Sequence, residues 1–111
     1  MPTRQSEEMV LLQGTLDLLV LRALQEGPLH GYAVARWIGA ASGDVLRVEE
    51  GSLYPALHRM ESSGWLSSEW KQTETGRRAK FYRLTRPGRK ALGVESSVWR
   101  AFVAAVEKVI S

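Results

Sequence analysis

The stretch at residues 50–66, EGSLYPALHRMESSGWL, constrains the fold more than any other part of the chain. Leu53, Leu57 and Met60 recur at intervals of three and four residues, which predicts a helix with one buried stripe. Gly64 ends this helix, because glycine tolerates the left-handed conformation of a helix cap. The side chains between the apolar positions can donate or accept hydrogen bonds or touch methyl groups, and several of them must face away from the stripe. They are Ser52, Tyr54, Pro55, His58 and Arg59.

Pro55 lies inside the predicted helix, where it removes one backbone donor and crowds the carbonyl of Gly51. Because a flexible glycine reduces this strain, we expect a bent or loosened first turn rather than a broken helix. Glu49 or Glu50 opens the helix, since a negative charge suits a helix N-terminus.

Two helices are predicted before this one. The first follows Met9 in the run VLLQGTLDLLVLRALQEG, with Thr15 and Asp17 as first-turn residues and Gly27-Pro28 as its end. This helix is more apolar than one core face requires, which fits either partial cover by a second subunit or deep burial in the monomer. The second helix spans residues 31–41, with Arg36 facing outward. Its apolar side consists of Tyr32, Val34, Ala35 and Ile38.

The second half of the chain predicts a hairpin and a long helix. Residues 45–48 form a candidate short strand, and residues 65–72 and 79–84 two further strands, joined by TETGRR with Arg77 and Arg78 at the tip. Thr85 is the predicted N-cap of a helix over residues 87–110. The apolar spacing of this last helix continues to the end of the chain. Because little of a small domain is left to cover it, we expect it to pack on a partner.

Positive charge is concentrated in one segment. Residues 71–90 hold eight basic residues and one acid, a local charge of +7, so the rest of the chain carries −4 against a total of +3. A cationic patch on an otherwise acidic chain points to a polyanion at one face, and chance clustering on a solvated surface is the alternative.

Length and composition limit the classes to which the protein can belong. The 111 residues suffice for one compact domain, and there is no cysteine and no apolar run long enough for a membrane span. The polar N-terminus is unlike a secretory signal, so we expect a cytoplasmic protein that does not associate with a membrane. The spacing of His30 and His58 suggests no metal site, and no catalytic or cofactor-binding motif is present. An enzyme is therefore not expected.

The predicted order is helix, helix, short strand, helix, hairpin, helix. This is a mainly α fold with a small β-hairpin, a winged helix-turn-helix followed by a C-terminal helix. We divide it into a flexible tail (residues 1–8), a winged helix DNA-binding domain (residues 9–85) and a dimerisation helix (residues 86–111).

Four segments carry a family resemblance: LLQGTLDLLVLRAL, HGY at residues 30–32, EGSLYPALHRMESSGWL and GRRAKFYRLTRPGRKAL. Together they resemble the PadR family of bacterial transcriptional regulators over most of the chain. The resemblance implies a homodimeric repressor that binds a palindromic operator in double-stranded DNA. The third helix would enter the major groove, and the wing would contact phosphates or the minor groove.

The single C-terminal helix resembles the short subfamily, some members of which bind aromatic drugs between the subunits. The resemblance implies Trp99 and Phe102 as the candidate site for a small aromatic or hydrophobic effector. It implies a dimer interface formed by the first and last helices. The interface residues would be Leu12, Leu16, Leu19, Trp99, Phe102, Val103, Val106 and Ile110.

The candidate DNA contacts are Tyr32, Ser52, Tyr54, Pro55, His58, Arg59, Arg77, Arg78 and Lys80. Several alternatives stay open: Tyr32 and Tyr54 could belong to the core, and Lys80 could face away from DNA because strand residues alternate. Contacts to the DNA backbone are one reading of four further cations, and solvation or pairing with acids is an equal one. These cations are Arg83, Arg86, Arg89 and Lys90. Glu49 and Glu50 would weaken binding if they face phosphates, or could cap the helix and turn aside. The alternative function is a winged helix module for protein–protein contact without an effector.

Overall fold

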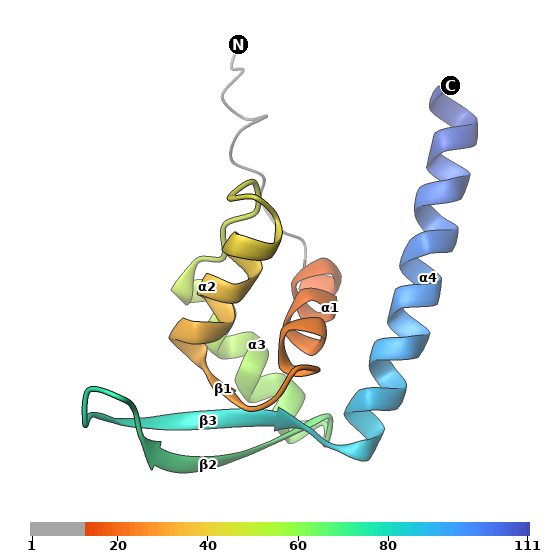
Figure 1. Cartoon of the computed structure of the whole chain (residues 1–111). Coiled ribbons are helices and arrows are strands. Elements are labelled where there is room, and N and C mark those ends of the chain that lie inside the picture. The colour runs from red at the N-terminus through yellow and green to blue at the C-terminus, as the bar shows by residue number, and fades with distance from the viewer. Residues whose placement is uncertain (1–12) are drawn as a thin grey trace.

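A computed structural model describes residues 13–111 of the chain. The elements in order are α1 (Gln13–Leu24), β1 (Leu29–His30), α2 (Gly31–Ala41), α3 (Glu50–Ser62), β2 (Leu66–Gln72), β3 (Arg78–Leu84) and α4 (Arg86–Ile110). Helices α1, α2 and α3 gather above the sheet, while α4 stands to one side and the β2–β3 hairpin extends in the other direction (Figure 1). The predicted tail and Leu12 lie outside the described residues.

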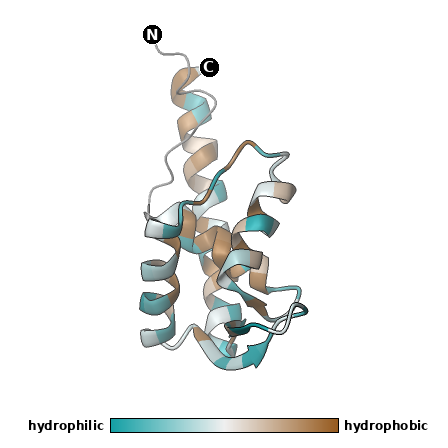
Figure 2. Cartoon of the chain, turned by 90° about the vertical axis from the view of Figure 1, so that its left-hand side faces the viewer, coloured by the Kyte–Doolittle hydropathy of each residue, from teal (hydrophilic) through white to brown (hydrophobic). Residues whose placement is uncertain are grey.

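The core lies where α1, α2 and α3 meet the sheet, as the hydrophobic segments in the interior of Figure 2 show. Leu53, Ala56, Leu57 and Met60 are the buried residues of α3, so the predicted stripe is confirmed. They meet other apolar side chains from α1, α2, the sheet and the start of α4. These include Leu16, Val20, Leu21, Leu24, Val34, Ile38, Leu66, Tyr82, Leu84 and Leu92.

Helix α3 begins and ends as the sequence predicted. Glu49 is its N-cap and Glu50 its first residue, and Pro55 does not break it. Gly64 adopts φ +87°, and the Trp65 amide donates to the Met60 carbonyl at 3.0 Å. This hydrogen bond satisfies a carbonyl that the end of the helix leaves free, and the chain turns directly into β2.

The sheet is antiparallel with strand order β1-β3-β2. The predicted hairpin is confirmed, with Gly76 at φ +86° in its turn. The strand predicted at residues 45–48 is wrong, because this segment has no strand structure. Instead Leu29 and His30 occupy the free edge of β3, opposite Tyr82 and Phe81. Two residues between a proline and a helix carry too short a pattern to predict a strand.

Three predictions for the first two helices are corrected. Helix α1 ends at Leu24, before Gly27-Pro28, and has no acidic residue in its first turn, so Asp17 is not a first-turn residue. Helix α2 spans the predicted range, but Tyr32 is 59% exposed and does not belong to its apolar side. The side chain of His30 caps α2, because its Nδ1 accepts a hydrogen bond from the Ala33 amide at 3.2 Å.

The start of α4 is fastened to the start of β2. Thr85 is the N-cap, as predicted, and its hydroxyl oxygen accepts from the Gly88 amide at 3.0 Å. The same hydroxyl lies 2.6 Å from the Gly64 carbonyl, and the Thr85 amide donates to the Trp65 carbonyl. Gly88 lies against Trp65, the residue before β2, and a Cβ on it would stand 2.0 Å from the Trp65 carbonyl oxygen. This contact sets the angle at which α4 leaves the domain.

We therefore expect Gly88→Ala to lower the free energy of unfolding by about 1–3 kcal/mol, because the methyl group must displace backbone. Gly93→Ala is the matched control on the same helix, where a Cβ meets nothing within 4 Å. It should stabilise the protein by roughly 0.5–1 kcal/mol through helix propensity. Urea unfolding at one fixed protein concentration measures both, and equal effects of the two substitutions would contradict this account.

Candidate nucleic-acid interface

The outward face of α3 is defined by its buried stripe. With 3.6 residues per turn, Pro55, His58 and Ser62 lie opposite the buried positions, and all three are exposed. Tyr54 and Glu61 flank this face on the side of the hairpin, while Ser52 and Arg59 flank it on the side of α1. Of the predicted base-contacting residues, Pro55 and His58 are therefore the most prominent.

Arg59 is engaged within the protein. Its guanidinium forms a hydrogen-bonded ion pair with Asp17 of α1, whose side chain is only 17% exposed. This pair fixes the rotation of α3 relative to α1. Arg59 is thus a positioning residue in this structure, and a base contact from it would require breaking the pair with Asp17. The sequence did not reveal this partner, because 42 residues separate the two side chains.

Tyr54 and Tyr32 both lie on the surface rather than in the core. Tyr54 is 45% exposed, and its ring lies on Gly31, where a Cβ would come within 2.6 Å of it. Tyr32 stacks on the ring of His30 with centroids 6.5 Å apart. The guanidinium of Arg36 lies 5.7 Å from the Tyr32 ring. The two tyrosines therefore present their rings beside the N-terminus of α2, a place suited to a phosphate.

A polar contact joins α3 to both strands of the hairpin. Glu61 accepts a hydrogen bond from the Ser68 hydroxyl at 2.6 Å and forms an ion pair with Lys80 at 3.2 Å. The hydrogen bond from Ser68 lowers the pKa of Glu61, burial partly opposes this, and Lys80 and His58 lower it further. The bond to Glu61 in turn raises the pKa of Lys80. Lys80 therefore orients the hairpin against α3, which makes it less available to DNA than Arg77 and Arg78.

The tip of the hairpin carries two exposed cations. Arg77 and Arg78 are both exposed, as predicted, and the guanidinium of Arg78 lies 5.5 Å from the ring centre of Trp70. Lys71 is placed similarly over Phe81 at 4.9 Å. Further along, Arg83 donates to the Ser67 hydroxyl, and Arg86, Arg89 and Lys90 are exposed at the start of α4. Two acids, Glu69 and Glu74, accompany five cations along residues 66–84.

Glu49 and Glu50 lie exposed at the N-terminus of α3, and the side chain of Glu49 makes no capping hydrogen bond. The predicted capping role of Glu49 is thus limited to its backbone carbonyl, which accepts from the Ser52 and Leu53 amides. Negative charge at this position interacts favourably with the dipole of α3.

The predicted effector and dimer residues lie mostly on the exposed part of α4. Trp99 and Phe102 are 42% and 59% exposed, with ring centres 6.0 Å apart, and Val103, Val106 and Ile110 are also exposed. The exception is Leu16, which is 3% exposed and packs in the core of its own chain. Leu19 is half-buried and lies at the edge of this core.

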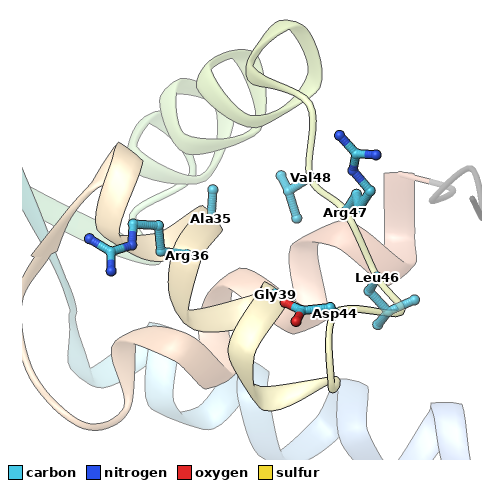
Figure 3. A pocket seen from close by; sticks show the side chains of 7 residues that line it. All are labelled: Ala35, Arg36, Gly39, Asp44, Leu46, Arg47 and Val48. Carbon is cyan, nitrogen blue, oxygen red and sulfur yellow. The ribbon is translucent and has the colours of Figure 1, made fainter.

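An open hollow of about 420 Å³ lies between α2 and the segment that leads to α3. Ala35, Arg36 and Gly39 form one wall, and residues 44–48 form the other (Figure 3). The guanidinium groups of Arg36 and Arg47 extend away from each other on opposite walls. Asp44 adopts φ +65° here, a conformation that aspartate tolerates at tight turns. The lining offers no group of catalytic side chains.

Within residues 13–111, no three histidine, cysteine, aspartate or glutamate side chains come together as metal ligands. In the same part of the chain, no helix combines the length and the apolar character that crossing a bilayer requires.

Sequence reasoning missed three residues of this surface: Glu61, Ser68 and Trp70. Their role depends on the register of β2 against β3 and on the position of α3 over the sheet. The alternation of β2 gave the only available signal, since it places Ser68 and Trp70 on one face.

Three packed helices, a three-stranded sheet with a cationic hairpin and a polar outward helix define a winged helix-turn-helix regulator that binds DNA. The family model described as the PadR-like family of transcriptional regulators matches residues 20–94. The chain belongs to this family, as its sequence predicted. Members of the family regulate transcription and are not enzymes, in agreement with the lack of a catalytic motif.

Similar proteins agree with this assignment. Transcriptional regulator Rv3488 of Mycobacterium tuberculosis is 50% identical over 80 residues, which cover 72% of this chain and 71% of that protein. A transcriptional regulator from Clostridium thermocellum has a TM-score of 0.81 at 27% identity, with 89% of this chain and 96% of that chain covered. A PadR family transcription regulator from Clostridium difficile has a TM-score of 0.74 at 28% identity, with 86% and 98% covered.

The contact between Glu61, Ser68 and Lys80 predicts a pH-dependent stability. The pKa of Glu61 in the folded protein is lower than its ordinary value of 4.5. Ionised Glu61 therefore stabilises the fold above about pH 4.5, and this stabilisation is lost as the pH falls through the folded-state pKa. Glu61→Gln should therefore lower the urea midpoint at pH 7, and the difference from the unaltered protein should disappear in more acidic solution. Glu74→Gln, in the hairpin turn, is the control. A difference that stays the same at every pH down to the acid unfolding of the protein would contradict this role.

Proposed function

We propose that this protein is a homodimeric repressor that binds a palindromic operator in double-stranded DNA. The observation that carries the proposal is the exposed face of α3, with Pro55 and His58 outermost, beside a hairpin that presents Arg77 and Arg78. An α-helix fits the major groove, and cations on the hairpin would reach the flanking phosphates. In this proposal, Ser52, Tyr54 and Tyr32 add base or phosphate contacts. Such a protein would act in the cytoplasm, where bacterial DNA lies.

The apolar stripe of α4 supports the homodimer. Its first members, Gly88, Ala91 and Leu92, are buried against the chain's own domain. By the 3.6-residue period, Val98, Phe102 and Val106 continue the same stripe, yet residues 97–111 are all exposed. Hydrophobic segments recur along this projecting part of α4 in Figure 2. A second copy would cover the stripe, with Leu19, Trp99, Val103 and Ile110 also in the interface. Two copies related by a two-fold axis would present two α3 helices, which fits a palindrome.

A small aromatic or hydrophobic effector is the further part of this proposal. Trp99 and Phe102 stand side by side on the exposed stripe, inclined at 37°, and would line the space between two α4 helices. A planar apolar molecule would suit two such rings. A cavity beside these rings in the dimer would favour release of the repressor by an effector. Solid packing would favour a regulator without one.

The second candidate function, a winged helix for protein–protein contact, is favoured by the ion pairs that engage Arg59 and Lys80. It predicts no salt-dependent binding to DNA, which separates it from the proposed function.

If the hairpin contacts phosphates, Arg77→Ala combined with Arg78→Ala should weaken binding to all duplexes about equally. The slope of log Kd against log salt should become shallower by at most about two units, because two phosphate contacts are lost. Fluorescence anisotropy with a labelled duplex at several salt concentrations gives this slope. Arg100→Ala, on the exposed part of α4, is the control and should leave it unchanged. An unaltered slope in the double variant would remove the hairpin tip from the phosphate contacts.

If a second copy covers α4, Val106→Glu should produce monomers, because it places a charge in the apolar interface. Ala104→Glu adds the same charge on the opposite side of the helix and should leave the dimer intact. Sedimentation velocity distinguishes the two species. A Val106→Glu variant that sediments as a dimer would refute this interface.

A further inference from the structure

Trp70 of β2 is exposed in a way that packing within the chain does not explain. Its side chain is 58% exposed, whereas Trp37 and Trp65 pack against the core. An indole ring left in water forgoes the free energy that burial of its apolar area would supply. Exposed aromatic side chains on a charged surface are typical of binding sites, since tryptophan is enriched there.

The strand register shows which way the ring faces. Trp70 is paired with Lys80, and Ser68 with Tyr82. Directly opposite residues of an antiparallel pair share one face, as do residues two apart along a strand. Because Ser68 and Lys80 both contact Glu61, this is the face of the hairpin that turns toward α3. Trp70 therefore lies on the inner face of the hairpin, beyond the end of its contact with α3.

The surroundings of the ring are cationic. The guanidinium of Arg78 lies 5.5 Å from the Trp70 ring centre. Lys80, whose charge is paired with Glu61, is the partner of Trp70 on the neighbouring strand. The segment at residues 66–84 has five basic and two acidic residues. An apolar ring with a cation stacked on it and an indole N–H at its edge matches a sugar–phosphate backbone. The deoxyribose offers an apolar surface, and the adjacent phosphate accepts hydrogen bonds and attracts the cation.

We propose that Trp70, held by Arg78, is a DNA-backbone contact of the hairpin, in which the ring packs on a deoxyribose of the strand that lies between the hairpin and α3. The inference rests on the proposed DNA-binding function and adds to it an apolar contact. It also assigns a second role to Arg78, which orients the ring while its charge faces the neighbouring phosphate.

The test that observes the ring directly is fluorine NMR of the full chain with 5-fluorotryptophan in place of its four tryptophans. Trp70→Phe identifies the Trp70 signal by its loss. A short mixed-sequence DNA duplex, added at low salt, should shift or broaden the Trp70 signal. The signals of Trp37 and Trp65 should stay in place, and they serve as internal controls because both side chains pack against the core.

Binding measurements separate the apolar contact from the electrostatic one. Trp70→Ala should weaken duplex binding about 5- to 10-fold, with an unchanged slope of log Kd against log salt because no charge is lost. Trp70→Phe should retain most of the affinity. Arg78→Ala alone should reduce the slope by about one unit. Thermal unfolding of each variant shows whether the hairpin is intact, and the fluorine signal gives the answer even if Trp70→Ala unfolds.

The outcomes are distinguishable. If the unaltered protein binds the duplex and the Trp70 signal does not move, the Trp70 contact is wrong and the proposed function stands. If the signal moves with protein concentration in the absence of DNA, the ring contacts a second copy of the chain, which also overturns the inference. If the unaltered protein binds no duplex at any salt concentration, the proposed function itself fails.

Discussion

Burial of the α3 stripe is the constraint on which the rest of the structure depends. Leu53, Leu57 and Met60 can be covered only if α1, α2 and the sheet surround them on one side. That burial determines the opposite face, so Pro55 and His58 must point outward. Two polar contacts then fix the rotation of the helix: Arg59 with Asp17 on one flank, and Glu61 with Ser68 and Lys80 on the other. Under the proposed function, contacts that do not themselves reach DNA thus specify the surface that would meet it.

The hairpin and α4 extend from opposite sides of the domain. The hairpin extends away from the helices at one side, and α4 projects at the other (Figure 1). Both originate in the short junction where Gly64 turns the chain out of α3 and Thr85 fastens the start of α4 to Trp65. Under the proposed function, a change in the angle between two α4 helices would change the spacing of two α3 helices. Gly88 approaches Trp65 closely at this junction.

Local rules explain what the sequence could predict. The helix caps at Gly64 and Thr85, the apolar stripe of α3 and the glycine turn at Gly76 depend on neighbouring residues, and each prediction is confirmed. The errors involve partners distant in the chain. Residues 45–48 have strand-forming side chains, yet Leu29 and His30 are the residues that pair with β3. For Tyr32 the sequence left a core position and a phosphate contact equally open, and the partner of Arg59 could not be identified by spacing. The positions of Glu61 and Trp70 in this surface likewise could not be predicted without the strand register.

The central claim is that α3 and the hairpin together form a sequence-specific DNA-binding surface. Its most direct test is a mobility shift with DNA from upstream of the protein's own coding sequence, at two salt concentrations and with a random duplex as competitor. The account predicts a shift that survives the competitor and weakens as salt rises, because base contacts give specificity and phosphate contacts give the salt dependence. A shift that the competitor abolishes completely, at both salt concentrations, would contradict it.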